Sequence, residues 1–510
     1  MTHSRLRLAI AAALVLVVPL AGCTALFPPA VAATSTPTGE KVDAALEPFY
    51  SQVLEWNSCE DGLQCSTAKA PLNWADPAAG EIELALIRQP ATSGSAKGSL
   101  LVNPGGPGGS GYDFIATGVT RATSARLQSS FDIVGFDPRG VGRSSAVSCY
   151  DDPADFDDFI FGLLPGEYGS DEWISEYAEA NAQFGKDCLE HTGELLEFVD
   201  TVSAARDLDL LRAALGDKKL DYLGFSYGTL LGATYADLYP KKTGHLVLDG
   251  ALDPSTTAAD VSISQAVGFE SALRAYLTAC LGGDSCGFSG SVDEAMTSIR
   301  ELLDRLDLSP LRAKDGRELG SATMSIAIIL PLYDEANWPY LDQLFTSVKQ
   351  GDASVAFQLA DSYYERDANG EYLSNSTEAF LAINCLDYSS DPSLESMRSE
   401  EAKLVDAAPV LGEQLAFGGV GCSEWPFPPT RERAEIHAVG SADILVVGTT
   451  NDPATPYKWA VSLADQLDNG HLVTYKGEGH TAYNRSNQCV NDAVDDYLID
   501  SVVPGSDPKC

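Results

Sequence analysis

A serine enclosed by two glycines is the pattern in this chain that points most directly to chemistry. Gly224, Ser226 and Gly228 form Gly-x-Ser-x-Gly directly after the predicted strand 220–223. In a nucleophile elbow this pattern places the serine in a strained turn between a strand and a helix, where the crowded backbone requires the glycines. The pattern therefore predicts that the Ser226 hydroxyl is presented as a nucleophile. The alternative is a serine in an ordinary strand-to-helix turn, and these five residues alone do not decide between the two.

A serine hydroxyl is a poor nucleophile without a base, and that base is most often a histidine. Downstream of residue 22 the chain has five histidines: His191, His245, His437, His471 and His480. With a nucleophile elbow, the base follows the serine in the chain and lies in a loop after a strand. His191 precedes the serine, two others begin predicted strands, and His437 precedes the last acidic loop. His480 follows the predicted strand 472–475 in a glycine-rich loop, so it is the predicted base.

The third member of a triad is an acid that orients the histidine. Asp443 precedes the predicted strand 444–447, whereas Asp452 follows it and so lies at the same edge of the sheet as Ser226. The segment between Asp452 and His480 accommodates one helix and one strand, which is the connection that this geometry requires. The predicted triad is therefore Ser226, Asp452 and His480, in that order along the chain.

A glycine-rich segment, 104–111, follows the predicted strand 99–103 and precedes the nucleophile in the chain. It could be a flexible loop, but its position suits the loop that supplies a backbone N–H to an oxyanion hole. We expect the N–H groups of Gly106 and Tyr227 to be the two donors. This chemistry needs no cofactor, and the chain has neither a Cys-x-x-Cys pair nor two histidines at zinc-site spacing, so no metal is expected.

Strands alternate with helices in two separate parts of the chain, which predicts an α/β fold. Between these parts, helical periodicity continues through about 255–430, with amphipathic stretches at 266–280, 292–306, 338–349 and 353–364. We interpret this region as a helical cap inserted into the core, because the core pattern resumes after it; the alternative is an independent partner-binding domain. The predicted boundaries are 1–22 for a signal peptide, 23–41 for a flexible tether, 42–254 and 431–510 for the core, and 255–430 for the cap.

The N-terminus has the pattern of an export signal. Arg5 and Arg7 precede an apolar run, 8–20, which leads into Leu-Ala-Gly-Cys at 20–23. This ending resembles a lipobox, so we expect cleavage before Cys23 and lipidation of that cysteine. The alternative is a plain signal peptide with an incidental cysteine. The apolar run is too short to favour a membrane-spanning helix.

Cysteine usage and charge agree with export. Without Cys23, the eleven cysteines become ten, an even number typical of an oxidising compartment. Sequence proximity suggests five bridges: Cys59–Cys65, Cys149–Cys188, Cys280–Cys286, Cys385–Cys422 and Cys489–Cys510. The formal net charge of −40 opposes contact with nucleic acid and anionic lipid, so we expect no nucleic-acid partner and membrane attachment only through the lipid anchor.

Taken together, the motifs resemble those of secreted actinobacterial tripeptidyl aminopeptidases, which are α/β-hydrolases related to prolyl aminopeptidases. The matching segments are 103–111, 137–144, 224–228, 382–387 and 477–480 with Asp452. The resemblance implies an α/β-hydrolase fold with a helical cap between the nucleophile-bearing half and the acid and histidine segment. It also implies release of short peptides, often tripeptides, from free N-termini of peptides or proteins. Because relatives include exported proteases and hydrolases of esters, a cell-envelope esterase or lipase and an endopeptidase remain alternatives. A non-catalytic binding role is disfavoured because no triad residue is missing.

The same resemblance implies that carboxylates in or near the cap bind the substrate's α-amine. The candidates in this chain are Asp334, Glu335 and Asp387. Each has an alternative role: Asp334 and Glu335 as the start of a solvent-facing helix, and Asp387 as a brace for the Cys385–Cys422 bridge.

Overall fold

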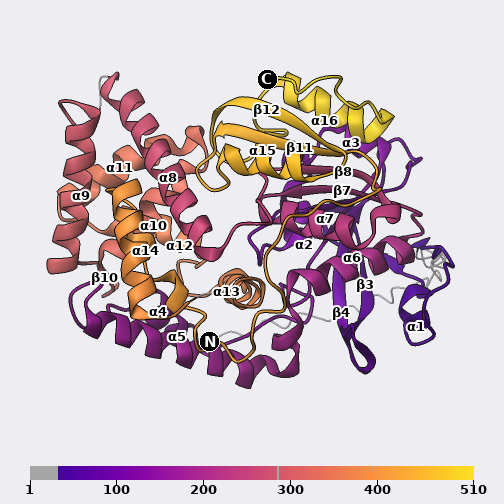
Figure 1. Cartoon of the computed structure of the whole chain (residues 1–510), viewed down its shortest axis with the longest axis horizontal. Coiled ribbons are helices and arrows are strands. Elements are labelled where there is room, and N and C mark those ends of the chain that lie inside the picture. Colours follow the sequence, from indigo (N-terminus) through magenta and orange to yellow (C-terminus); the bar gives the residue numbers. More distant parts are fainter. Residues whose placement is uncertain (1–32, 284–285, 390) are drawn as a thin grey trace, which may run out of the picture.

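A ten-stranded sheet lies at the centre of the computed structural model, which describes residues 33–283, 286–389 and 391–510 (Figure 1). Its strand order is β1-β2-β3-β4-β6-β5-β7-β8-β11-β12. The strands are β1 Ala33–Thr34, β2 Glu55–Ser58, β3 Gln64–Asn73, β4 Asp76–Gln89, β5 Ser99–Asn103, β6 Asp132–Phe136, β7 Leu220–Phe225, β8 Thr243–Asp249, β11 Ile444–Asn451 and β12 Gly470–Glu478. The first four strands in this order, β1 to β4, pair antiparallel with their neighbours. The other six, β6, β5, β7, β8, β11 and β12, are parallel to one another.

The parallel strands are apolar on both faces because helices cover both sides of the sheet. In β7, Tyr222 packs into one hydrophobic cluster, while Leu223 and Phe225 pack into the other. The helices are α1 Glu47–Tyr50, α6 Thr201–Leu215, α7 Tyr227–Leu238 and α15 Tyr457–Gln466 on the first side, and α2 Gly111–Ala122, α3 Ala125–Ser130 and α16 Gln488–Asp500 on the second. This arrangement confirms the predicted α/β-hydrolase fold.

A second hydrophobic core lies in the helical region between β8 and β11, beside the sheet in Figure 1. Its main helices are α8 Ala258–Leu281, α9 Val292–Leu308, α10 Ser321–Leu332, α11 Trp338–Lys349 and α12 Ser354–Tyr363, and a two-stranded ribbon, β9 Leu311–Arg312 with β10 Glu318–Leu319, joins α9 to α10. Helix α14, Leu394–Ala407, packs against α8. We call the helices α8–α12 and α14 the cap.

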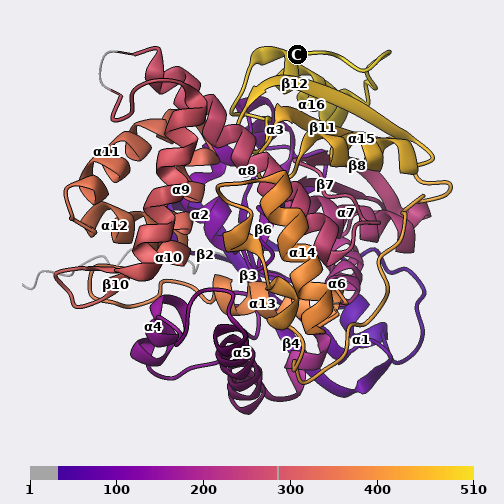
Figure 2. The same ribbon diagram turned by 60° about the vertical axis from the view of Figure 1, so that its left-hand side comes forward.

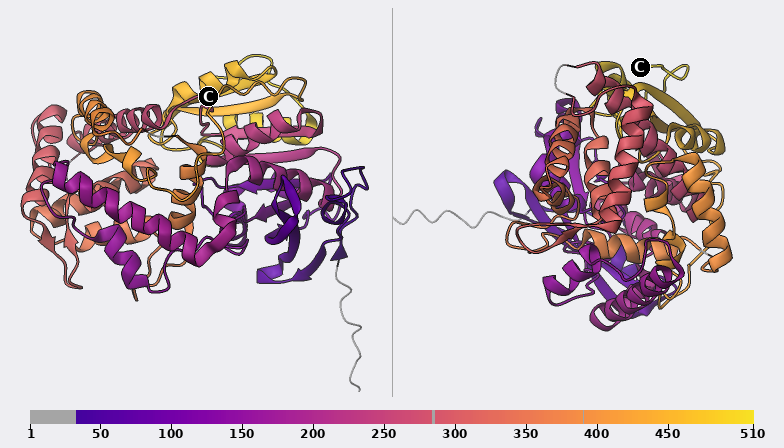
Figure 3. Two further views of the ribbon diagram at one scale, coloured as in Figure 1. Left: turned by 60° about the horizontal axis from the view of Figure 1, so that its bottom comes forward. Right: turned by 90° about the vertical axis from the view of Figure 1, so that its left-hand side faces the viewer.

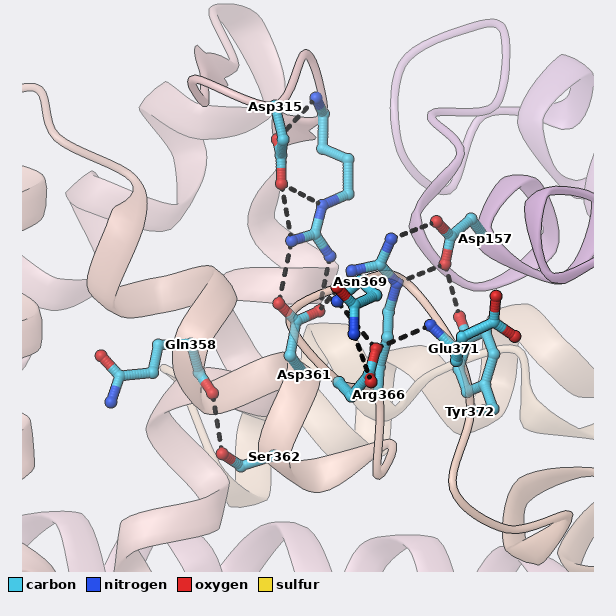
Figure 4. Close-up of polar contacts among 11 residues, drawn as sticks. Asp157, Asp315, Gln358, Asp361, Ser362, Arg366, Asn369, Glu371 and Tyr372 are labelled. Atoms are coloured by element: carbon cyan, nitrogen blue, oxygen red, sulfur yellow. Dashed lines mark hydrogen bonds and ion pairs between the residues drawn. The ribbon is translucent and has the colours of Figure 1, made fainter. Parts of the chain in front are cut away.

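Two helices that precede the nucleophile pack against both the cap and the core of the sheet, although the sequence assigned their residues to the core alone. Helices α4, Pro153–Phe161, and α5, Asp171–Thr192, lie along the cap, as Figures 2 and 3 show. Phe161 is part of the cap's hydrophobic core. The paired Asp157 and Arg366 side chains join α4 to the segment after α12, and Tyr372 donates to the same carboxylate at 2.7 Å (Figure 4). The acidic composition of this segment concealed its packing against the later helices.

Helix α13, Ser376–Asp387, lies within the predicted cap but packs on the sheet's core. Its buried residues Ala379, Ala382, Ile383 and Leu386 join the same cluster as α6 and α7. In Figure 1, α13 lies between the cap helices and the sheet.

The described part of the predicted flexible tether, 33–41, is bound to the core. β1 pairs with β2, and Thr38 N–H donates to the Ala213 carbonyl at 3.0 Å. Glu40 accepts from the buried Arg212 at 2.9 Å and from Lys242 at 2.7 Å. A carboxylate that neutralises a buried guanidinium fixes this segment despite its tether-like composition. Residues 1–32, including Cys23, lie outside the described residues, and within those that are described no helix is both long and apolar enough to cross a membrane.

The described part of the chain contains five disulfide bridges, and they join the pairs that sequence proximity suggested: Cys59–Cys65, Cys149–Cys188, Cys280–Cys286, Cys385–Cys422 and Cys489–Cys510. The Cys385–Cys422 bridge ties α13 to the segment that leads back from the cap to the core.

Candidate active site

Ser226 occupies the turn between β7 and α7 with φ 53° and ψ −124°. A non-glycine residue with positive φ is strained, so it persists only where the surroundings hold it. A Cβ on Gly224 would lie 2.4 Å from the Gly228 carbonyl oxygen, and a Cβ on Gly228 would lie 2.9 Å from the Asn103 carbonyl oxygen, which explains why both flanking positions are glycine. The side chain of Ser226 is half-buried and therefore reachable from solvent.

Asp452 and His480 follow β11 and β12 and are hydrogen-bonded to each other. His480 Nδ1 lies 2.9 and 3.0 Å from the two Asp452 oxygens. The carboxylate is buried and also accepts from Ala454 N–H at 3.0 Å and from Thr455 N–H at 2.8 Å. A proton on Nδ1, directed at Asp452, leaves Nε2 free to act as a base.

The backbone around Gly250 brings the serine and histidine loops together. Ser226 N–H donates to the Asp249 carbonyl at 2.9 Å, and a Cβ on the next residue, Gly250, would lie 3.2 Å from His480 Cε1. Among the described residues no hydrogen bond joins Ser226 Oγ to the imidazole. Such bonds often form only when substrate is bound, so the observed arrangement is compatible with a triad.

Asp249 is a buried carboxylate in this site that the sequence did not identify. Its oxygens accept from Ala482 N–H at 3.0 Å and from Tyr483 N–H at 2.7 Å, two and three residues after His480. Burial raises the pKa of Asp249 to about 6, and the backbone N–H groups oppose that shift. Through its carbonyl and its carboxylate, Asp249 connects the serine turn with the histidine loop. Its position at the end of a buried strand, before Gly250, was the signal available in the sequence.

The glycine-rich loop lies against the nucleophile. A Cβ on Gly105, which has φ +99°, would lie 2.8 Å from Ser226 Cβ and 3.0 Å from Tyr227 N. Among the described residues, the N–H groups of Gly106 and Tyr227 have no hydrogen-bond acceptor, so both are available to a ligand. Asp137 anchors the end of the loop by accepting from Tyr112 N–H at 3.1 Å.

The cap reaches the histidine through the residues after α10. The Tyr333 carbonyl accepts from His480 N–H at 2.8 Å, and the Tyr333 ring packs edge-on against the imidazole at 5.4 Å. Asp334 and Glu335 follow directly and are exposed, and Asp334 also accepts from Ala336 N–H at 2.9 Å. The structure thus places two of the three candidate amine-binding carboxylates beside the histidine loop.

Glu478, a carboxylate that the sequence did not single out as an amine ligand, lies two residues before His480. Burial raises the pKa of Glu478, and the negative charge of Glu335 raises it further. Asn451 Nδ2 donates a hydrogen bond to the same carboxylate. A partly buried carboxylate with a second negative charge nearby favours a bound cation.

Asp387, the third candidate, is not in this group. It is 4% exposed, and its two oxygens accept from Thr201, one from the N–H at 3.0 Å and the other from the hydroxyl. Burial raises the pKa of Asp387 to about 6. A carboxylate enclosed and paired in this way is not open to a substrate amine.

Comparison with known proteins agrees with this fold. Residues 98–291 match the family model described as "alpha/beta hydrolase fold", and residues 408–510 match the one described as "TAP-like protein". The fold defines an α/β-hydrolase.

Three curated relatives narrow the class. The chain is 36% identical to serine protease Hip1 of Mycobacterium tuberculosis, over 91% of this chain and 92% of that protein. It is 34% identical to carboxylesterase B of the same species, over 96% of each chain, and 30% identical to tripeptidyl aminopeptidase of Streptomyces coelicolor, over 90% of this chain and 86% of that protein. The chain therefore belongs to the actinobacterial α/β-hydrolase family that includes tripeptidyl aminopeptidase and serine protease Hip1, and it is a serine hydrolase.

Proposed function

We propose that this protein is an exported serine exopeptidase that releases short peptides, most often tripeptides, from free N-termini. The observation that carries the proposal is the hydrogen bond between His480 Nδ1 and buried Asp452, at the sheet edge where Ser226 occupies a strained turn. Ser226, His480 and Asp452 act as nucleophile, base and orienting acid.

The reaction proceeds in two displacements. His480 Nε2 takes the proton from Ser226 Oγ as the hydroxyl attacks the scissile carbonyl, and Asp452 stabilises the imidazolium. The N–H groups of Gly106 and Tyr227 bind the oxyanion; removing one such donor typically costs about 10²–10³ in rate. The imidazolium then protonates the leaving amine, and water attacks the acyl-enzyme with His480 again acting as base.

A cationic α-amine fits the carboxylates beside His480. Glu335 and Glu478 lie at the histidine loop, where the cap meets the sheet, and Asp334 is adjacent. An amine held there neutralises two like charges and fixes how far the scissile bond lies from the N-terminus. This clamp is what distinguishes an aminopeptidase from a general acyl-transfer enzyme.

An esterase is the second candidate, because a relative of 34% identity is named carboxylesterase B. The same triad and oxyanion hole hydrolyse esters, so the distinction depends on the amine-binding carboxylates. An ester without an amine would not use them.

A fluorophosphonate probe tests the assignment of the nucleophile. We expect stoichiometric labelling of the wild type and none of Ser226→Ala, because only an activated serine attacks the phosphonate. Ser298→Ala, on the exposed face of α9, is the control and should label like the wild type. Labelling that persists in Ser226→Ala would exclude Ser226 as the nucleophile.

A further inference from the structure

A buried chain of hydrogen bonds runs from the end of α13 to the residue after the nucleophile. Thr201, the first residue of α6, donates its N–H to Asp387 Oδ1 at 3.0 Å and its hydroxyl to Oδ2. The Tyr227 hydroxyl lies 2.5 Å from Thr201 Oγ1. All three residues are at most 4% exposed, so water does not compete for these bonds.

The direction of this chain follows from its acceptor. An ionised carboxylate only accepts hydrogen bonds, so the Thr201 hydroxyl donates to Asp387 and accepts from the Tyr227 O–H. Burial keeps the pKa of Tyr227 well above its ordinary value, so the phenol remains a donor. Hydrogen bonds to a buried carboxylate are strong, and the chain therefore fixes the Tyr227 side chain.

Helix α13 also supports the loop on the other side of the nucleophile. A Cβ on Gly108 would lie 2.3 Å from the Ser376 carbonyl oxygen and 3.0 Å from Phe380 N. One helix is thus in contact with the glycine-rich loop through its first half and is linked to Tyr227, through Thr201, at its end.

From this geometry we propose that Asp387 and Thr201 are positioning residues, which hold the Tyr227 N–H in its oxyanion-binding place through the Tyr227 side chain. The inference rests on the proposed function, in which that N–H is a donor. The strained turn at Ser226 needs support from its surroundings, and catalytic donors must be held to within about 0.5 Å of the productive geometry. An unanchored Tyr227 would loosen the donor without removing the substrate's binding contacts.

The test compares Thr201→Val, which has the same shape but no hydroxyl, with Thr201→Ser, which keeps the hydroxyl. Active sites are first counted with the fluorophosphonate, and kcat, KM and the inhibition constant of a peptide boronate are then measured. We expect Thr201→Val to lower kcat per active site about tenfold, less than the loss of a whole donor. KM should stay within about twofold, the boronate should bind about tenfold more weakly, and Thr201→Ser should recover most of the loss.

Ser203→Ala is the matched control. Ser203 lies on the same turn of α6 and donates to buried Asp200 at 2.7 Å, but it is not bonded to Tyr227. It should lower thermal stability without changing kcat per active site. If Thr201→Val does not fold, Tyr227→Phe removes the same bond, keeps the ring and should show the same loss.

Two results would overturn the inference. One is an unchanged kcat per active site in Thr201→Val or Tyr227→Phe while the wild type is active. The other is an equal loss of kcat in Ser203→Ala, which would indicate a general effect of destabilising α6. A wild type that the fluorophosphonate does not label would instead overturn the proposed function and this inference with it.

Discussion

At the scale of single residues, the proposed site depends on which histidine nitrogen the partner carboxylate binds, and on where in the sheet the pair lies. Two Asp–His pairs at opposite ends of the same two strands show this. Asp452 is buried at the carboxyl end of β11 and bonds His480 Nδ1, whereas Asp443 is exposed at the amino end and bonds His471 Nε2 at 2.7 Å. Only the first pair lies at the sheet edge that carries Ser226.

These two pairs provide a prediction with an internal control. Asp452→Asn should leave the protein folded but lower kcat by roughly four orders of magnitude, because the wrong imidazole tautomer then faces Ser226. Asp443→Asn removes the same charge from the other pair and should leave kcat unchanged. Steady-state kinetics and circular dichroism decide the matter; comparable activities in the two variants would argue against Asp452 as the acid.

The triad candidates could be predicted from the sequence because two properties identify them: the order of serine, acid and histidine along the chain, and the position of each residue directly after a strand. The roles of Asp249 and Glu478 could not be predicted in this way, even though Asp249 follows a buried strand, because those roles depend on which residues lie opposite them in space. For Asp387 the sequence suggested the wrong role. Its place in a motif suggested ligand binding, but the carboxylate is hydrogen-bonded to Thr201, which lies 186 residues away in the chain.

At the scale of elements, the strands were the most predictable part. The predicted strands 99–103 and 444–447 correspond to β5 and the first half of β11, because buried parallel strands read as continuous apolar runs. Amphipathic helices α9 and α11 were likewise expected. Helix α10 was missed because it is apolar nearly all round.

Helix α13 carries a pH-dependent contribution to stability. Glu378 in its first turn accepts from Cys149 N–H at 2.6 Å, and burial raises the pKa of Glu378 from 4.5 to about 7. Because the folded state holds this proton more tightly, the associated stability is present below about pH 4.5 and is lost as the pH rises through about 7.

Glu378→Gln tests this sign, since glutamine resembles the protonated acid. Thermal unfolding measures the difference in Tm, variant minus wild type, at each pH. We expect this difference to be more positive at pH 8 than at pH 5 by about 2 °C. Glu179→Gln, at an exposed position of α5, serves as the control and should show no such trend. A difference in Tm that is the same at both values of pH would refute the role of Glu378.

At the scale of the whole molecule, the cap packs against two helices from an earlier part of the chain, α4 and α5, which precede the nucleophile. Arg366 and Asp157 join these parts, as do Arg398 and Asp171 at 3.0 Å. The cap contacts the histidine loop through Tyr333, whose carbonyl accepts from His480 N–H.

Attachment to the cell surface is a prediction from the N-terminal sequence. We expect the mature chain to begin at a lipidated Cys23, with its other ten cysteines in bridges. Intact-mass measurement of detergent-extracted, non-reduced protein should show this species, and Cys23→Ser should release the protein from membranes. An unmodified N-terminus at another residue would contradict lipid anchoring.

The most direct measurement of exopeptidase function compares a peptide amide with a free N-terminus and the same peptide N-acetylated. A desolvated charge pair costs about 2–5 kcal/mol when one partner is lost, so acetylation should lower kcat/KM by at least about 30-fold. Glu335→Gln and Glu478→Gln should each reduce that discrimination, whereas Asp387→Asn should lower the cleavage of both peptides alike. Equal cleavage of free and acetylated peptides by the wild type would contradict an amine-binding site and leave an esterase or endopeptidase.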